Sequence, residues 1–274
     1  MPQLDALPPS VCARKKMVTF ANQRLRFLLP SRYVRVRGAD GLIYLNLSES
    51  NMMLQRAARV YEYWTASFMR RYLQAGMTAV DVGANKGDYT LLFARHVGPT
   101  GRVIAFEPDD ANVTWLQRSL DANHYGWVQL ETTALSDEDR TATFYPGLKS
   151  GWGSLRSNRR QAEDRPPFTV RTRRLDDVLR DLDLPDVDLL KVDVEGAELG
   201  VLRGATSLLT GSDRVTLIMD VDVHSSDERA QLFELLHGEC GLRVWSLGRS
   251  LRPIDDLSEA ATIVASKRTL PNAL

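Results

Sequence analysis

Acidic side chains stand at the ends of short apolar runs, and their positions predict the chemistry of one site. Asp81 opens the turn of "VDVGANKGDYT" (80–90), and Glu107 ends the next apolar run, "VIAFEP". Gly83 and Gly87 would let the backbone of the turn approach a ligand, and the helix expected after it would point its N-terminus at that ligand. A carboxylate at the mouth of such a turn would repel a phosphate, so it favours a ligand with positive charge.

The glycine pattern excludes two common nucleotide-binding signatures. A dinucleotide-binding fold requires G-x-G-x-x-G, whereas this turn reads G-x-x-x-G, and the Gly-Lys-Ser/Thr of a phosphate-binding loop is absent. S-adenosylmethionine (SAM) carries a sulfonium and an α-ammonium group and no phosphate, so it suits Asp81. Glu107 stands twenty residues after Gly87, where an acid can accept hydrogen bonds from both ribose hydroxyls. Singly these features are typical of a tight turn and a solvated acid, but in this order they predict a SAM site.

A second group of acids follows a later apolar run. Asp193 and Glu195 lie in "KVDVEG", at the carboxyl end of an expected parallel strand, where open α/β sheets place their chemistry. Glu195 could instead cap the next helix, because the first turn of a helix favours acids. We therefore expect Asp193 and Glu195 as candidate catalytic residues, with the capping role open for Glu195.

The neighbouring run ends in "MDVDVH" and offers two more acids and a histidine. Strand alternation would send Asp220, Asp222 and His224 to one face and Val221 and Val223 to the other. Such a polar face is costly unless it is wet or functional, so His224 is a candidate general base, although a lone histidine is more often a satisfied surface residue. The alternative is Mg²⁺, which prefers hard oxygen ligands. The ligands of that metal site would be Asp193, Asp220 and Asp222.

The segment 147–168, "GLKSGWGSLRSNRRQAEDRPPF", has the composition of a loop. It is either a solvated loop or a lid over the methyl acceptor, with Trp152 stacking on a sugar and arginines meeting an anionic group. Its place beside the expected active edge of the sheet favours the lid, and "TATFY" and "FTVRT" on either side predict a small strand pair. The arginines of this segment are Arg156, Arg159, Arg160 and Arg165.

Short apolar runs alternate with helical patterns from about residue 77, which predicts βαβ units and a mostly parallel sheet covered on both faces. The last two runs, 242–248 and 261–267, have no helical pattern between them, so the final strand should be antiparallel. Before residue 77 we expect a loose leader over the first dozen residues and a hairpin over 32–47. These are followed by one amphipathic helix or by a pair of helices with a break between them. The helical period is carried by Leu54, Ala58, Tyr61, Trp64, Phe68 and Tyr72.

Composition limits the class of protein. The chain has 274 residues, 43% of them hydrophobic and 26% charged, and a formal net charge of zero, which disfavours nucleic acid as a partner. The two cysteines, Cys12 and Cys240, have no metal-type spacing, and no apolar run reaches membrane-spanning length. We expect a cytoplasmic protein made of an N-terminal extension (1–76) and one domain (77–270), with a homodimer left open.

The blocks "VDVGANKGDYTLLFA", "VIAFEPDDANVTWLQRSL", "TTALSD", "GSL" and "LLKVDVEGAELGVLRGA" resemble the FkbM family of SAM-dependent methyltransferases. The resemblance covers roughly residues 77–224 and implies an α/β Rossmann-like class I methyltransferase fold, with seven strands and an antiparallel last strand. It also implies O-methylation of a sugar, glycolipid or natural-product hydroxyl. Residue by residue, it places the methionine end of SAM against Asp81, Gly83, Ala84, Asn85 and Gly87, the ribose at Glu107 and Pro108, the adenine near Ala134, Leu135 and Ser136, and the departing methyl group beside Asp193.

Three other functions compete with this interpretation. N-methyltransferases of nucleic acid or protein amides usually carry an Asn/Asp-Pro-Pro-aromatic run where this chain has Asp193-Val-Glu-Gly, although a small-molecule N-methyltransferase stays open. A dehydrogenase would share the fold but need the third glycine. A SAM-fold binding protein without catalysis is the third, and the presence of every expected acid argues against it.

Overall fold

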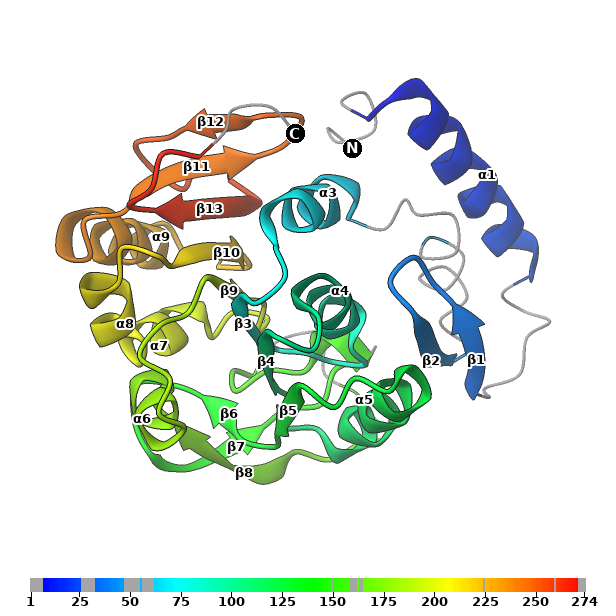
Figure 1. Cartoon of the computed structure of the whole chain (residues 1–274), viewed down its shortest axis with the longest axis horizontal. Coiled ribbons are helices and arrows are strands. Elements are labelled where there is room, and N and C mark those ends of the chain that lie inside the picture. The colour runs from blue at the N-terminus through cyan, green and yellow to red at the C-terminus, as the bar shows by residue number, and fades with distance from the viewer. Residues whose placement is uncertain are drawn as a thin grey trace.

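An eight-stranded sheet forms the centre of the molecule in the computed structural model, which describes residues 7–25, 33–46, 55, 62–148, 150–157, 162, 165–223, 225–258 and 260–270 (Figure 1). The strand order is β12-β11-β13-β10-β9-β3-β4-β5. The strands are β3 (Thr78–Val82), β4 (Arg102–Phe106), β5 (Val128–Glu131), β9 (Leu189–Val192), β10 (Thr216–Asp220), β11 (Arg243–Leu247), β12 (Leu251–Pro253) and β13 (Thr262–Ser266).

Strand directions confirm the predicted α/β fold. β3, β4, β5, β9 and β10 pair in parallel, while β13 is antiparallel to both β10 and β11. The expected seven strands are joined by an eighth, β12, which returns antiparallel along β11 at the edge of the sheet. Pro253 ends this short strand, and an edge position tolerates a proline because one side of the strand needs no hydrogen-bond partner.

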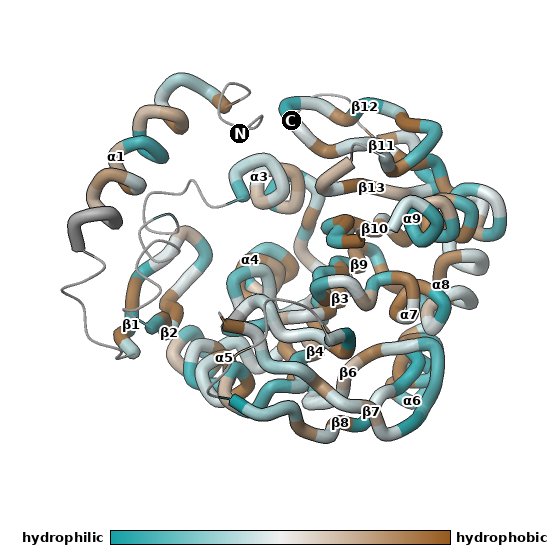
Figure 2. The backbone as a smooth tube through the Cα atoms, turned by 180° about the vertical axis from the view of Figure 1, so that it is seen from behind, coloured by the Kyte–Doolittle hydropathy of each residue, from teal (hydrophilic) through white to brown (hydrophobic). Residues whose placement is uncertain are grey.

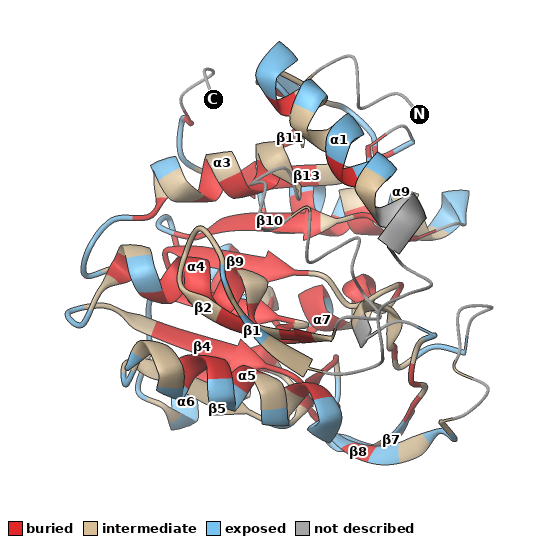
Figure 3. Cartoon of the chain, turned by 90° about the vertical axis from the view of Figure 1, so that its right-hand side faces the viewer, coloured by how far each residue is buried: buried red, intermediate tan, exposed pale blue. Residues whose placement is uncertain are grey.

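Helices cover both faces of the sheet (Figure 1). One face packs against α3, α4 and α5, and the other against α6, α7, α8, α9 and the short π-helical turn η3. The central strands are almost entirely buried, and hydrophobic residues concentrate in β3, β9 and β10 (Figures 2 and 3). The helices are α3 (Tyr63–Tyr72), α4 (Asp88–Val97), α5 (Asp110–Asn123), α6 (Leu175–Asp181), α7 (Glu198–Arg203), α8 (Thr206–Gly211), α9 (Ser226–Phe233) and η3 (Glu234–Glu239).

The predicted N-terminal hairpin is confirmed as β1 (Tyr33–Arg37) and β2 (Leu42–Asn46), which pair antiparallel. It packs on the outer side of α4 and α5 (Figure 1). Ile43 is buried there, and the Asn123 carboxamide of α5 accepts a hydrogen bond from the backbone N–H of Leu42 and donates one to its carbonyl. The hairpin thus forms an additional layer on the domain.

The leader expected over the first dozen residues is wrong from Pro9 onward, because helix α1 (Pro9–Leu25) begins there. Among residues 9–21, the part of this helix whose burial is described, only Val11 and Val18 are buried, and two apolar positions seven residues apart are too sparse to reveal a helical period. Helix α3 contains the later half of the predicted amphipathic helix. Leu54, Ala58 and Tyr61 lie outside the described residues.

A separate three-stranded sheet, ordered β6-β8-β7, stands beside the central one. Its antiparallel pair β7 (Arg140–Phe144) and β8 (Phe168–Arg173) confirms the strands predicted to flank the loop, and β6 (Ala134–Leu135) lies parallel to β8. Within the described parts of the chain, every helix is too short or too polar to cross a bilayer.

Candidate functional site

The glycine turn after β3 depends on both of its glycines for folding. Gly83 and Gly87 have φ angles of 81° and 97°, which side-chain-bearing residues rarely adopt. A Cβ atom on Gly83 would lie 1.9 Å from the carbonyl oxygen of Asp193, and one on Gly87 would lie 2.4 Å from the side chain of Leu116. The turn therefore packs against the end of β9 and against α5, so these glycines serve the protein's own packing as well as the approach of a ligand.

Glu107 fixes the turn to the end of β4. Its Oε2 accepts a hydrogen bond from the backbone N–H of Asn85 at 2.7 Å, and its Oε1 accepts from the N–H of Asp109 and from the Asn112 carboxamide at 2.9 and 3.2 Å. Burial raises the pKa of Glu107 to about 7, although these hydrogen bonds oppose the shift. A buried acid aimed at the mouth of the sheet suits a ligand that brings hydroxyl or cationic groups.

A cavity of about 540 Å³, counting its part open to solvent, lies over the carboxyl ends of β3, β4 and β9. The side wall beyond Glu107 is formed by Thr133 and strand β6, and Asp193 borders the opposite side. Seven of the residues expected to bind SAM line this cavity, namely Gly83, Asn85, Glu107, Pro108, Ala134, Leu135 and Asp193.

Four expected residues do not line the cavity. Asp81 is fully buried, and its carboxylate meets Lys191 and the Thr90 hydroxyl, so its predicted contact with the positive charge of SAM is not seen. Ala84 is buried in a core cluster with Leu91 and Leu116. Gly87 packs against Leu116. The Ser136 hydroxyl donates to Asp137 rather than facing the cavity. Sequence spacing assigns a segment to the site, but only the local backbone decides which of its side chains turn inward.

Buried polar atoms without partners indicate that the cavity takes a hydrogen-bonding ligand. Asn85 Oδ1 and Thr133 Oγ1 belong to cavity-lining residues, and both are buried with no hydrogen-bond partner within the described chain. Such atoms cost free energy unless a ligand or water completes them. SAM offers ribose hydroxyls, an adenine amino group and an ammonium group, all of which can donate to them.

The loop after β7 covers this cavity. Gly151, Gly153, Ser154 and Leu155 line it, and the Ser154 hydroxyl donates to the carbonyl of Val194 at 3.2 Å. The lid predicted over the acceptor therefore lies, in its described part, over the cavity that fits the cofactor.

The described arginines of this loop pair with the protein's own acids. Arg156 contacts Glu228 of α9 at 2.7 Å, and Arg165 forms two hydrogen bonds of 2.8 Å with Asp109. Trp152 is half-buried and is not among the residues lining the cavity. Arg159 and Arg160 lie outside the described residues.

A buried lysine lies between acidic side chains at this edge of the sheet. Lys191 is 4% exposed, pairs in register with Asp81, and places its Nζ 3.7 Å from Asp81 Oδ1 and 3.3 Å from Asp193 Oδ2. Its ammonium also lies 4.8 Å from the ring centroid of Tyr89, and the Thr90 hydroxyl donates to the second oxygen of Asp81. Burial alone would lower the pKa of Lys191, but the charges of Asp193 and Asp81 together raise it, so this lysine is a fixed cation.

Asp220 faces the same lysine. Burial, and then the charge of Asp193, raise the pKa of Asp220, whose carboxylate accepts a hydrogen bond from Thr262. Val221 and Val223 enter the core as strand alternation predicted. Within the described part of the chain, no group of three or more acids, histidines and cysteines is arranged to hold a metal ion. Mg²⁺ at Asp193, Asp220 and Asp222 is thus unsupported, and Lys191 is the cation that the structure places beside two of them.

The turn after β9 leaves the N-terminus of α7 without a side-chain cap, so the capping role considered for Glu195 is not seen. Glu195 is half-buried with a left-handed φ of 54°, whereas Glu198, in the first turn of α7, is buried and accepts a hydrogen bond from the N–H of Gly196 at 3.0 Å. Burial raises the pKa of Glu198 to about 7. Glu195 does not line the cavity, and His224 lies outside the described residues.

Sequence reasoning missed several participants. Lys191 interrupts the apolar run "LLKVDV", and a charged residue inside an otherwise buried strand was the signal that could have identified it. Tyr89 follows the glycine turn by two residues and had no distinguishing feature. Thr133 and Ser154 reach the cavity only through the fold.

Comparison with known proteins gives the family. Residues 81–243 match the model of the Methyltransferase FkbM domain. The chain is 34% identical over 142 residues to Methyltransferase 1 of Beauveria bassiana, covering 46% of this chain and 57% of that protein. It is 28% identical over 144 residues to 2-O-methyltransferase NoeI of Sinorhizobium fredii, covering 48% and 58%. The chain thus matches less than two thirds of the length of these relatives.

A putative O-methyltransferase structure from Klebsiella pneumoniae covers 96% of this chain and 91% of its own, at 16% identity and a TM-score of 0.46, which is too low to support a conclusion. The family match extends over more than half of the chain and includes the glycine turn, Glu107 and the buried lysine. The chain therefore belongs to the FkbM family of SAM-dependent methyltransferases.

Proposed function

We propose that this chain transfers a methyl group from SAM to a hydroxyl group of a small-molecule or saccharide acceptor. The observation that carries the proposal is that Asp193 borders the cofactor cavity while its carboxylate is held by the buried cation Lys191. When bound, SAM supplies a methyl group on a positively charged sulfur, which an acceptor oxygen can displace in line.

The residues around the cavity would divide the work between binding and proton handling. Glu107 would accept hydrogen bonds from ribose hydroxyls. The side-chain oxygens of Asn85 and Thr133, which have no partner within the described chain, would form hydrogen bonds with the ligand. The loop residues Gly151 and Ser154 cover the cavity and would exclude water. Alignment of the acceptor supplies much of the acceleration in such a transfer.

Asp193 is the described group best placed to receive the hydroxyl proton. Its side chain is 31% exposed, which leaves an oxygen accessible while Lys191 holds Oδ2 at 3.3 Å. The ammonium of Lys191 would also stabilise negative charge developing on the acceptor oxygen. His224 is the alternative base on sequence grounds. The printed name of one relative, a 2-O-methyltransferase, supports oxygen as the acceptor atom.

Mass spectrometry tests the function directly. Glycosides and cell extracts incubated with SAM should yield products heavier by one methylene unit. Resistance to alkaline hydrolysis should distinguish an ether from an ester, and fragmentation that locates the methyl group on oxygen or nitrogen should distinguish an ether from an amine. Asp193→Asn should lower kcat by about 10²–10⁴-fold, the range for a general base, and EDTA should have no effect. A confirmed methylation that EDTA abolishes and Mg²⁺ restores would overturn this metal-free account, and unchanged kcat in Asp193→Asn would remove Asp193 as the base. His224→Ala then tests the alternative.

A further inference from the structure

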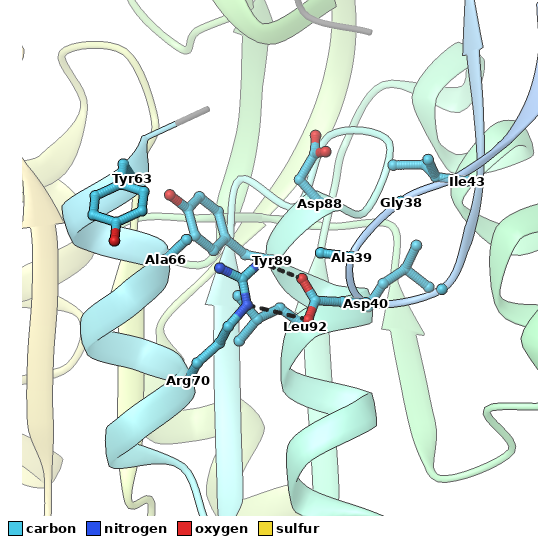
Figure 4. Close-up of a pocket in the computed structure, with 12 residues that line it drawn as sticks. Gly38, Ala39, Asp40, Ile43, Tyr63, Ala66, Arg70, Asp88, Tyr89 and Leu92 are labelled. Carbon is cyan, nitrogen blue, oxygen red and sulfur yellow. Dashed lines mark hydrogen bonds and ion pairs between the residues drawn. The ribbon is translucent and has the colours of Figure 1, made fainter. Parts of the chain in front are cut away.

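A second cavity lies behind the first turn of α4, on the side of the hairpin. It measures about 610 Å³ and is bounded by the turn Gly38–Gly41, by α3 and by α4 (Figure 4). Its floor is apolar and buried, whereas Tyr63 and Tyr89 bring phenol rings to its wall. The apolar residues of the floor are Ile43, Ala66, Leu91 and Leu92.

The charges of this cavity disfavour an anionic occupant. Arg70 forms two hydrogen bonds with Asp40, at 2.6 and 3.3 Å, so its guanidinium is already matched by a carboxylate (Figure 4). Asp88 adds another carboxylate to the wall. Because the Arg70 guanidinium is already matched, the described lining offers phosphate or carboxylate groups no further cation, whereas its carboxylate oxygens can accept hydrogen bonds from hydroxyls.

Tyr89 connects this cavity with the cofactor site. One residue of sequence separates it from Gly87, and its ring both lines the second cavity and lies 4.8 Å from the ammonium of Lys191. Lys191 in turn holds Asp193 at the wall of the cofactor cavity. A ligand in the second cavity would thus contact Tyr89, whose ring contacts the lysine that holds Asp193.

The two walls of the second cavity differ in origin. The α4 wall lies within the family match, which covers 81–243, whereas the hairpin turn and α3 precede it. Members of one family share the cofactor and differ in the acceptor, so selectivity is expected where a chain-specific segment faces the common core.

We propose that the second cavity binds the ring of the methyl acceptor, an uncharged ring with an apolar face and hydroxyl groups, as in a glycoside. Its apolar face would pack on Tyr63 and the leucine floor, and its hydroxyls would meet Asp88 and the phenol of Tyr89. This inference rests on the proposed function, because it names the substrate class of the same transfer.

Methyl-labelled NMR of the full chain tests it without an activity assay. Ile43, Ala66, Leu91 and Leu92 report the second cavity, and Ala134, Leu135 and Leu155 report the cofactor cavity. S-adenosylhomocysteine should shift the latter set, and phenyl β-D-glucopyranoside, added to that complex, should shift the former. Glucose 6-phosphate should leave both sets unchanged.

Two variants separate the cavities. Ala66→Trp fills the second cavity and should abolish the glycoside shifts but keep those of S-adenosylhomocysteine, whereas Ala134→Trp should do the reverse. Tyr63→Ala, a milder change, should weaken glycoside binding by about 3- to 10-fold, the effect of one aromatic contact. Glycoside shifts confined to the cofactor set, or absent in the wild-type chain, would overturn the inference. Absence of S-adenosylhomocysteine shifts would instead overturn the proposed function.

Discussion

The two cavities on either side of the first turn of α4 are formed by different kinds of structural element. The cofactor cavity is formed largely by backbone turns and short loops, and two residues of its lining, Asn85 and Thr133, have buried oxygen atoms without a hydrogen-bond partner in the described chain. The second cavity is formed by side chains of two helices and a hairpin turn. In its one described ion pair, the charges of Asp40 and Arg70 balance each other. The first cavity demands a particular hydrogen-bonding ligand, whereas the second mainly offers shape and apolar surface.

This difference indicates how the protein separates a common reaction from a particular substrate. The turn, Glu107 and Asp193 all lie within the family match, so we expect them to serve the cofactor that the family shares. The second cavity takes eight of its twelve lining residues from the segment before residue 81. Changes in the first cavity should therefore alter cofactor binding, and changes in the second should leave it intact.

Lys191→Met should have the largest effect, because Lys191 stands between the cavities and supports both. Removing one partner of a buried ion pair leaves Asp81 and Asp193 without their cation and should cost about 3–5 kcal/mol of unfolding free energy. Urea denaturation measures this loss, and Lys191→Arg, which keeps the charge, should lose less. Wild-type stability of Lys191→Met would mean that these carboxyls are already neutral.

Gly83→Ala should break the cofactor cavity alone. The added Cβ would meet the carbonyl oxygen of Asp193 at 1.9 Å, and the φ of 81° adds strain, so we expect a loss of about 2–4 kcal/mol and of SAM binding. Gly98→Ala is the matched control, since its φ is 64° but nothing lies within 4 Å of the new atom. Its ψ of −175° also lies in a region that is almost confined to glycine, so Gly98→Ala should cost about 1–3 kcal/mol and leave SAM binding unchanged. Equal losses in both variants would show that the contact with Asp193 is unimportant.

Glu107 should make stability depend on pH. Burial raises its pKa from 4.5 to about 7, so between these values the folded chain binds a proton that the unfolded chain has released. Stability should therefore be highest below about pH 4.5, fall as the pH rises to about 7 and then level off, by up to roughly 3 kcal/mol from this residue. Glu198 contributes in the same direction. Urea denaturation of Glu107→Gln across this range should show a smaller slope than the wild-type chain, and an unchanged slope would contradict the assignment.

Asp40→Asn should have a small effect that is confined to the second cavity. Its ion pair with Arg70 is partly exposed, so its removal should cost about 1 kcal/mol or less, measured by urea denaturation. Asp139→Asn, which disrupts the more exposed pair with Arg171, should cost still less. SAM affinity should be unchanged in both variants, and a loss of affinity in Asp40→Asn would show that the two cavities are not independent.

The difference between the cavities also explains how far the sequence could predict the molecule. The parallel strands were predictable because their apolar runs are nearly continuous, and Glu107 because it ends such a run at a fixed distance from the turn. The antiparallel last strand followed from the absence of a crossover helix. These features depend on neighbours in sequence, and they position most of the cofactor site.

Features that depend on distant contacts were not predictable. The loop at Ser154 covers the cofactor cavity because it binds the backbone of Val194, forty residues away. Glu195 does not cap α7, and its backbone is left-handed, while Glu198 accepts a hydrogen bond from the N–H of Gly196 in the turn before that helix. The second cavity unites the hairpin turn with α4, and no local pattern in either segment indicates the other.

Calorimetric titration of SAM into the wild-type chain and Glu107→Ala tests the central assignment most directly. The wild-type chain should bind one SAM, and Glu107→Ala should bind it at least about tenfold more weakly, because a charged hydrogen-bond acceptor contributes about 1.5–3 kcal/mol. Glu131→Ala is the matched control, since Glu131 ends the neighbouring strand β5, accepts from Gln129 and does not line the cavity, so it should bind like the wild type. Equal affinity in all three proteins, or no binding by the wild-type chain, would contradict the SAM site described above.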